Sequence, residues 1–199
     1  MTAVLHKLFI IISCVVLFSC TGSNVMQGGD SALTGSNLSY IDVDSDVESD
    51  FNSAVVLIQQ EKYSQAIDVL KSVIEREQRL PAPYVNLAIA YNRSGNSKEA
   101  EANLISALKL DIGDPVANNE LGLLYRKAGK FKAAHTAYSN AIRQHPDYLP
   151  AKRNLGVLCD LYMHDYQCAL EQYEAYLEQK PDDSTVAIWI ADVKSRLDK

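Results

Sequence analysis

The residues that most often carry enzyme chemistry are few and scattered in this chain. Apart from His6 near the N-terminus, the histidines are His135, His145 and His164, and none has a cysteine pair or carboxylate at a metal-ligand spacing. The sequence has no glycine-rich phosphate loop, no G-x-S-x-G elbow and no H-E-x-x-H helix. We therefore expect no catalytic residue, no metal site and no cofactor, and histidines that are structural or face solvent.

A run of alternating acids invites comparison with a calcium loop. The acids are Asp42, Asp44, Asp46, Glu48 and Asp50. An EF-hand loop that starts at Asp42 needs glycine at its sixth position and an acid at its twelfth, where this chain has Val47 and Ser53. The sequence therefore favours a solvated acidic segment whose later members face the positive N-terminus of the first helix.

Two cysteines near the C-terminus, Cys159 and Cys168, lie almost symmetrically about a turn at Met163 and His164. On antiparallel helices they would stand at a similar height, and an oxidising compartment would allow a disulfide. The alternative is that both cysteines stay reduced and pack as small hydrophobic residues. The position of Cys168 favours this alternative, because Cys168 precedes the inward-facing Ala169 and would point away from Cys159. The sequence leaves both alternatives open.

The composition limits the number of domains and the kinds of partner. With 199 residues, 47% of them hydrophobic and 22% charged, the chain can bury one ordinary core but not two large ones. Its net charge of −6 argues against a nucleic-acid partner, which requires clustered lysine and arginine. We expect neither nucleic acid nor a small-molecule substrate, and no membrane-spanning helix after the N-terminal segment.

Residues 1–19 have the layout of a secretory signal peptide. A short polar start carries Lys7, and an almost uninterrupted apolar run follows from Leu8 to Phe18. Removal of this segment, with Lys7, takes the net charge from −6 to −7.

The end of the signal resembles the lipobox of bacterial lipoproteins, to which Leu17, Ser19 and Cys20 correspond. The resemblance implies that Cys20 carries a diacylglyceryl group and an acyl chain, which together would anchor the chain stably. Thr21, rather than aspartate, follows the cysteine, so outer-membrane placement facing the periplasm is expected. The alternative is a simple secretory cleavage that leaves Cys20 as an ordinary thiol.

Residues 20–45 are rich in Gly, Ser, Asn and Asp and show no helical period. This composition is typical of a flexible linker, with a reach of about 25–30 Å.

A repeat of 34 residues organises the remainder of the chain. It aligns Leu87, Ala88 and Tyr91 with Leu121, Gly122 and Tyr125, and further columns pair Gly95 with Gly129, Ala100 with Ala134 and Ala107 with Ala141. This pattern resembles the tetratricopeptide repeat, with Asn118 in place of its tryptophan. The resemblance implies an all-α fold, a right-handed solenoid of four helix-pair repeats over residues 46–182, at about 47–80, 81–114, 115–148 and 149–182. The last repeat has one extra residue before Ala169.

Residues 183–199 are expected to form a helix that caps the solenoid. Val186, Ile190, Val193 and Leu197 form an apolar stripe at helical spacing. Trp189 adjoins this stripe and is interpreted as a packing residue.

The inner wall of the solenoid is the expected binding surface. The 34-residue step places Asn52, Asn86, Glu120 and Asn154 in one column, and side-chain amides both donate to and accept from a peptide backbone. The alternative is a structural role at the seams between repeats.

Charge gives a second indication of binding. The first helices of the second to fourth repeats carry Arg93, Arg126, Lys127, Lys152 and Arg153 against Glu120 and Asp160, a net +3 in a chain of −7. This segregation favours an acidic segment or a C-terminal carboxylate. The candidate binding residues are Asn52, Asn86, Arg93, Asn119, Arg126, Arg153 and Asn154. Phe51 and Val55 replace the Lys and Asn of the carboxylate-clamp version of this repeat, so binding of a chaperone tail is not supported.

The sequence thus predicts a lipid-anchored adaptor that holds a polypeptide and has no chemistry of its own. The resemblance to lipoproteins of this repeat class implies a role in assembly of an envelope machine such as a pilus or secretin. The alternatives are a component of an energy-transduction or motility complex, and an accessory that organises cell-wall or polysaccharide enzymes.

Overall fold

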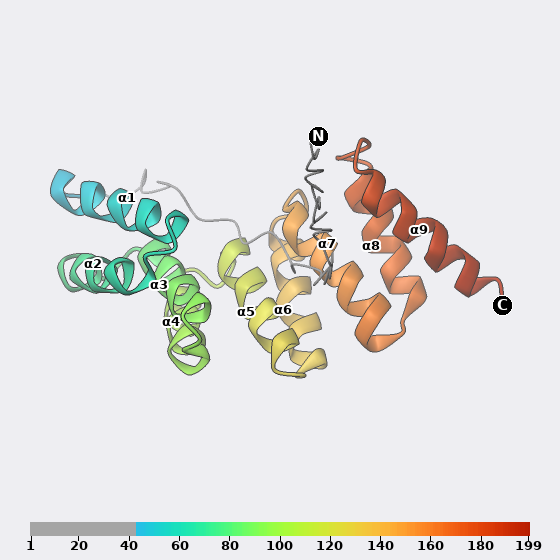
Figure 1. The fold of residues 1–199 in the computed structure, drawn as a ribbon, viewed down its shortest axis with the longest axis horizontal. Helices are drawn as coiled ribbons and strands as arrows, with labels where there is room; N and C mark the ends of the chain where they lie inside the picture. The colour runs from blue at the N-terminus through green and yellow to red at the C-terminus, as the bar shows by residue number, and fades with distance from the viewer. Residues whose placement is uncertain (1–42) are drawn as a thin grey trace, which may run out of the picture.

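The computed structural model describes residues 43–199, and all regular structure in this part of the chain is helical (Figure 1). The all-α fold class is confirmed. The expected signal peptide, the lipidation site Cys20 and the linker up to residue 42 lie outside the described residues. Among residues 43–199, no helix has the length and apolar character that a membrane span requires.

The described helices form four successive pairs and one final helix. They are α1 (Ser45–Gln59) with α2 (Tyr63–Arg76), α3 (Pro81–Arg93) with α4 (Ser97–Leu110), α5 (Pro115–Lys127) with α6 (Phe131–Gln144), α7 (Leu149–Leu158) and its π-helical extension η1 (Cys159–Met163) with α8 (Tyr166–Leu177), and α9 (Ser184–Leu197). Pro81, Pro115 and Pro150 stand in the first turns of α3, α5 and α7, where a missing N–H costs nothing and the fixed φ favours the helix.

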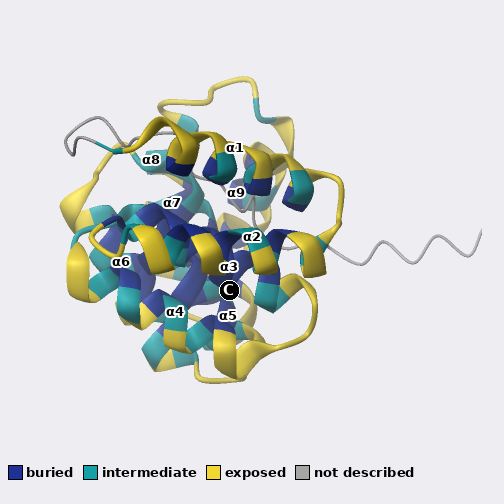
Figure 2. Ribbon diagram, turned by 90° about the vertical axis from the view of Figure 1, so that its left-hand side faces the viewer, coloured by how far each residue is buried: buried dark blue, intermediate teal, exposed yellow. Residues whose placement is uncertain are grey.

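The first helices of the pairs form one layer and the second helices form another. Helix α1 contacts α3, α3 contacts α5 and α5 contacts α7, whereas α2, α4 and α6 each contact the first helix of the next pair. Helix α3 is buried along most of its length, while α2 buries a single face (Figure 2). Because the first helices pack closely together, they line the inside of the curve. We call α1, α3, α5, α7 and α9 the inner layer and its open surface the inner face.

Small residues let the two helices of a pair approach each other. A Cβ atom built on Gly156 would lie 2.5 Å from two ring carbons of Tyr173, and one on Gly122 would overlap the ring of Tyr138. Both rings are buried, at 1% and 0% exposure, and burial raises the pKa of both phenols well above the ordinary value. The atoms nearest to a Cβ on Gly122 thus belong to the ring of Tyr138.

The turn inside each pair needs one residue in the left-handed region. Gly95 (φ 89°) and Gly129 (φ 72°) provide it in the second and third pairs, where it costs little. Glu61 (φ 59°) and His164 (φ 54°) adopt it in the first and fourth pairs without that freedom. The glycine columns of the repeat therefore mark the turns.

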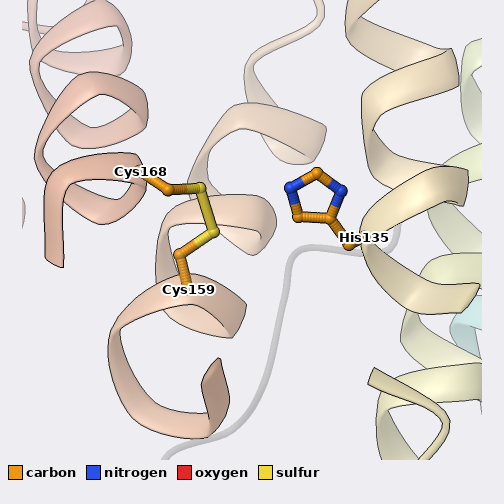
Figure 3. Close-up of side chains that lie close together, drawn as sticks. All are labelled: His135, Cys159 and Cys168. Carbon is orange, nitrogen blue, oxygen red and sulfur yellow. A yellow bond between two sulfur atoms is a disulfide. The ribbon is translucent and has the colours of Figure 1, made fainter. Parts of the chain in front are cut away.

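The fourth pair absorbs its extra residue as the π-helical turn η1. Cys159 at the start of η1 and Cys168 in α8 form a disulfide with Cα atoms 5.9 Å apart (Figure 3). Asp165 accepts a hydrogen bond of 3.0 Å from the backbone N–H of Cys168 and so caps α8. Of the two alternatives for the cysteines, the structure has the disulfide.

The final helix α9 closes the open end of the stack. Val186, Ile190 and Val193 are buried as expected, whereas Leu197 is 42% exposed, so the stripe ends one turn early. Trp189 packs against Tyr173 with ring centroids 5.4 Å apart.

A buried ion pair also ties α9 to the fourth repeat. The guanidinium of Arg196 lies 2.8 Å from a carboxylate oxygen of Asp160 in η1, and the Asp160 side chain is only 6% exposed. The hydroxyl of Tyr173 donates a 3.4 Å hydrogen bond to the same carboxylate. Arg196 also stacks on Tyr166, with its Cζ 4.8 Å from the ring centroid.

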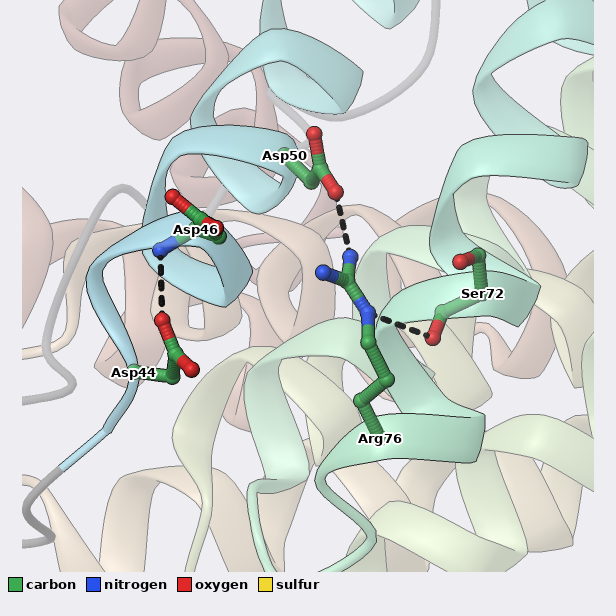
Figure 4. Close-up of polar contacts among 5 residues, drawn as sticks. All are labelled: Asp44, Asp46, Asp50, Ser72 and Arg76. Atoms are coloured by element: carbon green, nitrogen blue, oxygen red, sulfur yellow. Dashed lines mark hydrogen bonds and ion pairs between the residues drawn. The ribbon is translucent and has the colours of Figure 1, made fainter.

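The acidic segment at the start of α1 has structural partners (Figure 4). Asp44 is the N-cap residue and accepts a 3.0 Å hydrogen bond from the backbone N–H of Asp46. Asp50 forms an ion pair with Arg76 of α2, whose Nε also donates to the carbonyl of Ser72 at 3.3 Å. The acids therefore lie at the N-terminus of the first helix, as the sequence predicted.

The contact between Gly122 and Tyr138 gives a first prediction. Replacing Gly122 with alanine should force the buried ring to move and lower the free energy of unfolding by about 1–3 kcal/mol, although alanine is the better helix former. The measurement is chemical denaturation. Combining Gly122→Ala with Tyr138→Leu should cost less than the sum of the two single changes. Simple additivity would show that the two residues do not share this contact.

The pair of Arg196 with Asp160 gives a second prediction. Arg196→Met keeps an apolar stem but leaves Asp160 buried without its cation, and should cost about 3–5 kcal/mol of unfolding free energy in denaturant titrations. The control is Asp192→Ala, which removes the other carboxylate on the same guanidinium, itself 67% exposed. It should cost no more than about 1 kcal/mol. Equal losses in the two variants would contradict the assignment.

Candidate functional site

Two arginines of the inner layer lie over aromatic rings of the next first helix. The Cζ of Arg126 in α5 is 5.8 Å from the ring centroid of Tyr162 in η1, and the Cζ of Arg153 in α7 is 5.4 Å from that of Trp189 in α9. Both arginines are half-buried. Stacking of this kind contributes about 0.5–1 kcal/mol and limits the orientations of a guanidinium. The inner layer thus presents two oriented groups that match carboxylates.

Two further cations stand at the ends of inner-layer helices. Arg93 lies in the last turn of α3 and Lys127 in the last turn of α5, and both are exposed. With Arg126 and Arg153 they are the inner-layer cations on which the predicted positive charge of the inner face depends, and that charge stays a prediction.

The sequence predicted that Lys152 adds to this charge, and this prediction is wrong. Its side chain is buried, and its Nζ lies 3.5 Å from the carbonyl of Ala175 in α8. It therefore joins the two helices of the fourth pair. The two acids counted against this charge in the sequence are also not open to solvent. Asp160 forms an ion pair with Arg196, and Glu120 is buried at 3% exposure.

The asparagines predicted to bind a partner are mostly buried. Asn86, Asn119 and Asn154 are 0%, 0% and 2% exposed, and only Asn52 on α1 is open to solvent. Asn154 donates from Nδ2 to Oδ1 of Asn119 at 2.8 Å, and Asn86 donates to the carbonyl of Ala82 at 3.0 Å. A side-chain bond between α7 and α5 is a contact at a seam. This favours the structural alternative, and ligand contact by these amides stays a prediction.

Two of the three histidines in the described residues face solvent as predicted, and the third has neighbours that the sequence did not predict. His145 and His164 are exposed, whereas His135 of α6 faces the disulfide (Figure 3). One ring nitrogen of His135 and the two sulfur atoms all lie within 4.8 Å of one another. The search for ligand spacing along the sequence missed this cluster, because its members belong to two different repeats.

Sequence reasoning also missed the ring beneath Arg126. Tyr162 lies in the π-helical turn η1, where the extra residue of the fourth repeat interrupts the regular register, and the 34-residue step matches Tyr162 with Ala128, which has no ring. The exposed side chains of Tyr162 (43%) and Leu161 (42%) make this part of the inner layer partly apolar.

Two family models match the chain, both described as tetratricopeptide repeat. They cover residues 57–118 and 119–160, together just over half of the sequence.

Curated proteins are similar to about half of this chain. A tomato protein (Solanum lycopersicum), "Probable UDP-N-acetylglucosamine--peptide N-acetylglucosaminyltransferase SPINDLY", is 24% identical over 105 residues, which are 53% of this chain and 11% of that protein. Human "Tetratricopeptide repeat protein 16" is 32% identical over 100 residues, 47% of this chain and 12% of that protein. The chain therefore spans about a ninth of the length of these relatives.

Solved structures share the fold at low identity. The structure titled "Functional Characterization of Pseudomonas Aeruginosa pilF" superposes with a TM-score of 0.69 at 20% identity, over 75% of this chain and 68% of that one. "MamA 41-end from Desulfovibrio magneticus RS-1" gives 0.65 at 18% identity, over 78% of this chain and 87% of that one. The repeat pattern, the paired helices and both family models agree, and the chain therefore belongs to the tetratricopeptide repeat family.

Proposed function

We propose that this protein is a lipid-anchored scaffold of the bacterial envelope whose inner face binds an acidic polypeptide segment. The fold itself is that of a protein-interaction module, and its stacked repeats form an extended surface for a partner. The observation that carries the proposal is the pair of guanidinium groups of Arg126 and Arg153 held over Tyr162 and Trp189 on successive inner-layer helices.

A stacked guanidinium suits a carboxylate for a geometric reason. Its planar fork of N–H donors matches both oxygens of a carboxylate, and stacking on a ring limits the orientations of the fork. Because the arginines lie on neighbouring helices of the stack, an extended acidic segment would meet them in succession. Arg93 and Lys127 at the helix ends extend the field that would draw such a segment in.

Attachment to the membrane rests on the sequence of residues 1–20. The signal-peptide layout of residues 1–19, with Leu17 and Ser19 before Cys20, supports lipidation, and the expected linker before α1 would let the repeats stand away from the membrane. The likeness in fold to the Pseudomonas aeruginosa pilF structure supports, as part of this proposal, a role in assembly of an envelope machine such as a pilus or secretin.

Peptide selection tests the binding face and does not require the natural partner. Displayed short random peptides selected on the native protein should be enriched in Asp and Glu. With Arg126→Glu and Arg153→Glu combined, affinity for the selected peptides should fall by about 10-fold or more, and its salt dependence should largely disappear.

The matched control for this experiment reverses two charges on the second-helix layer. Lys132→Glu with Arg143→Glu changes the net charge equally, and both side chains are exposed on α6. This control should bind the selected peptides as the native protein does. Equal losses of affinity in the two double variants would show that the effect comes from net charge alone. Unchanged binding in the inner-face variant would exclude the arginine pair as the site.

The lipid anchor has a separate test. Cys20→Ser should release the protein from isolated membranes and abolish metabolic labelling with a fatty acid, because the thiol is the expected point of attachment. Labelling that persists in this variant would contradict the assignment. Since folding depends on the repeats, the circular dichroism of the variant should match that of the native protein.

A further inference from the structure

His135, Cys159 and Cys168 come from three different elements and meet at the seam between the third and fourth repeats. Helix α6 supplies the imidazole, η1 the first sulfur and α8 the second (Figure 3). The three candidate ligand atoms lie within 4.8 Å of one another. No other group of three such side chains was found among residues 43–199 with ligand atoms this close.

Two thiolates and one imidazole are a donor set that thiophilic metal ions prefer. Zinc takes sulfur at about 2.3 Å and histidine nitrogen at about 2.0–2.1 Å in a tetrahedral shell, so its ligand atoms stand roughly 3.5 Å apart. Here the imidazole nitrogen and the two bonded sulfur atoms lie within 4.8 Å of one another, so side-chain rotation could bring them to that spacing. Reduction of the disulfide and rotation of the two cysteine side chains would separate the sulfur atoms, while the imidazole is already directed toward them (Figure 3).

The surroundings of the cluster also fit a metal site. The hydroxyl oxygen of Ser139 lies 3.4 Å from Nδ1 of His135 and so occupies one ring nitrogen, which leaves Nε2 for a metal. Cys159 is buried, whereas His135 and Cys168 are half-buried. This depth shields the sulfur atoms and still gives an ion and one water access, as expected for a three-residue site with an open fourth position.

We propose that these three residues form a redox-controlled zinc site. In the oxidised protein Cys159 and Cys168 form the disulfide. A dithiol reductant breaks it by thiol–disulfide exchange: two electrons and two protons pass to the cysteine sulfurs, and the two thiols of the reductant become a disulfide. Zn²⁺ then binds both sulfurs and His135, releases the two thiol protons and takes a water as its fourth ligand.

The two states connect different parts of the solenoid. The disulfide joins η1 to α8 inside the fourth repeat, whereas zinc would also join both to α6 of the third repeat. Tyr162, which lies under Arg126 on the inner face, belongs to η1. Zinc at this site would therefore stabilise the seam next to the proposed binding face. The zinc site itself does not depend on the proposed function.

The test uses the full chain in detergent with Cys14 and Cys20 replaced by serine, so that only the pair can bind metal through sulfur. Zinc affinity is measured by competition with a chromophoric chelator, anaerobically, before and after reduction. Cadmium serves as a second probe, because cadmium–thiolate bonds absorb in the ultraviolet. The reduced protein should bind one equivalent of zinc and show the cadmium–thiolate band, and the oxidised protein should do neither.

Variants then identify the third ligand. His135→Ala should weaken zinc binding at least 10-fold, and His135→Gln serves as a second variant that retains the side-chain volume. His145→Ala, an exposed histidine, is the matched control and should bind as the parent does. Circular dichroism verifies that each variant is folded. Equal zinc affinity in the oxidised and reduced proteins, or full affinity without His135, would overturn the proposal.

Discussion

In the third and fourth pairs, the contact between a glycine and a buried tyrosine sets the distance between the two helices. At Gly122 and Gly156 the backbone lies against the rings of Tyr138 and Tyr173, and there is no room for a Cβ atom. The first helices of these two pairs, α5 and α7, also contact each other. Because Arg126 lies on α5 and Arg153 on α7, the positions of both arginines depend on this close approach.

The inner layer divides its polar residues between two tasks. Amides hold its helices together, as Asn154 does by donating to Asn119 at 2.8 Å, and burial makes such a bond costly to lose. Guanidinium groups lie over aromatic rings, as Arg126 and Arg153 do. The amide and guanidinium groups of the inner layer thus have different roles. The first maintains the shape of the wall, and the second gives it charge.

Periodicity determined what was predictable from the sequence. The repeat register, the small positions and the buried stripe of α9 follow from residue spacing, because identical pairs must pack identically. The environment of Arg126 does not follow, since Tyr162 lies in the π-helical turn η1, where the extra residue of the fourth repeat interrupts the periodicity. The sequence also does not specify whether the side chain of Lys152 points toward α8 or toward the inner face, and in the structure it points toward α8. His135 and the disulfide meet across two repeats, so no spacing along the chain connects them.

The central claim is that the inner face, and not the second-helix layer, holds the partner. A photo-reactive amino acid incorporated in living cells tests it most directly, at the exposed inner-layer positions Lys127 and Leu161 and at Lys132 and Thr136 on α6. The inner-layer positions should give a discrete crosslinked protein that disappears when Arg126 and Arg153 are changed to Glu, and the α6 positions should give none. A discrete crosslink from α6 alone, insensitive to the two arginines, would contradict the account.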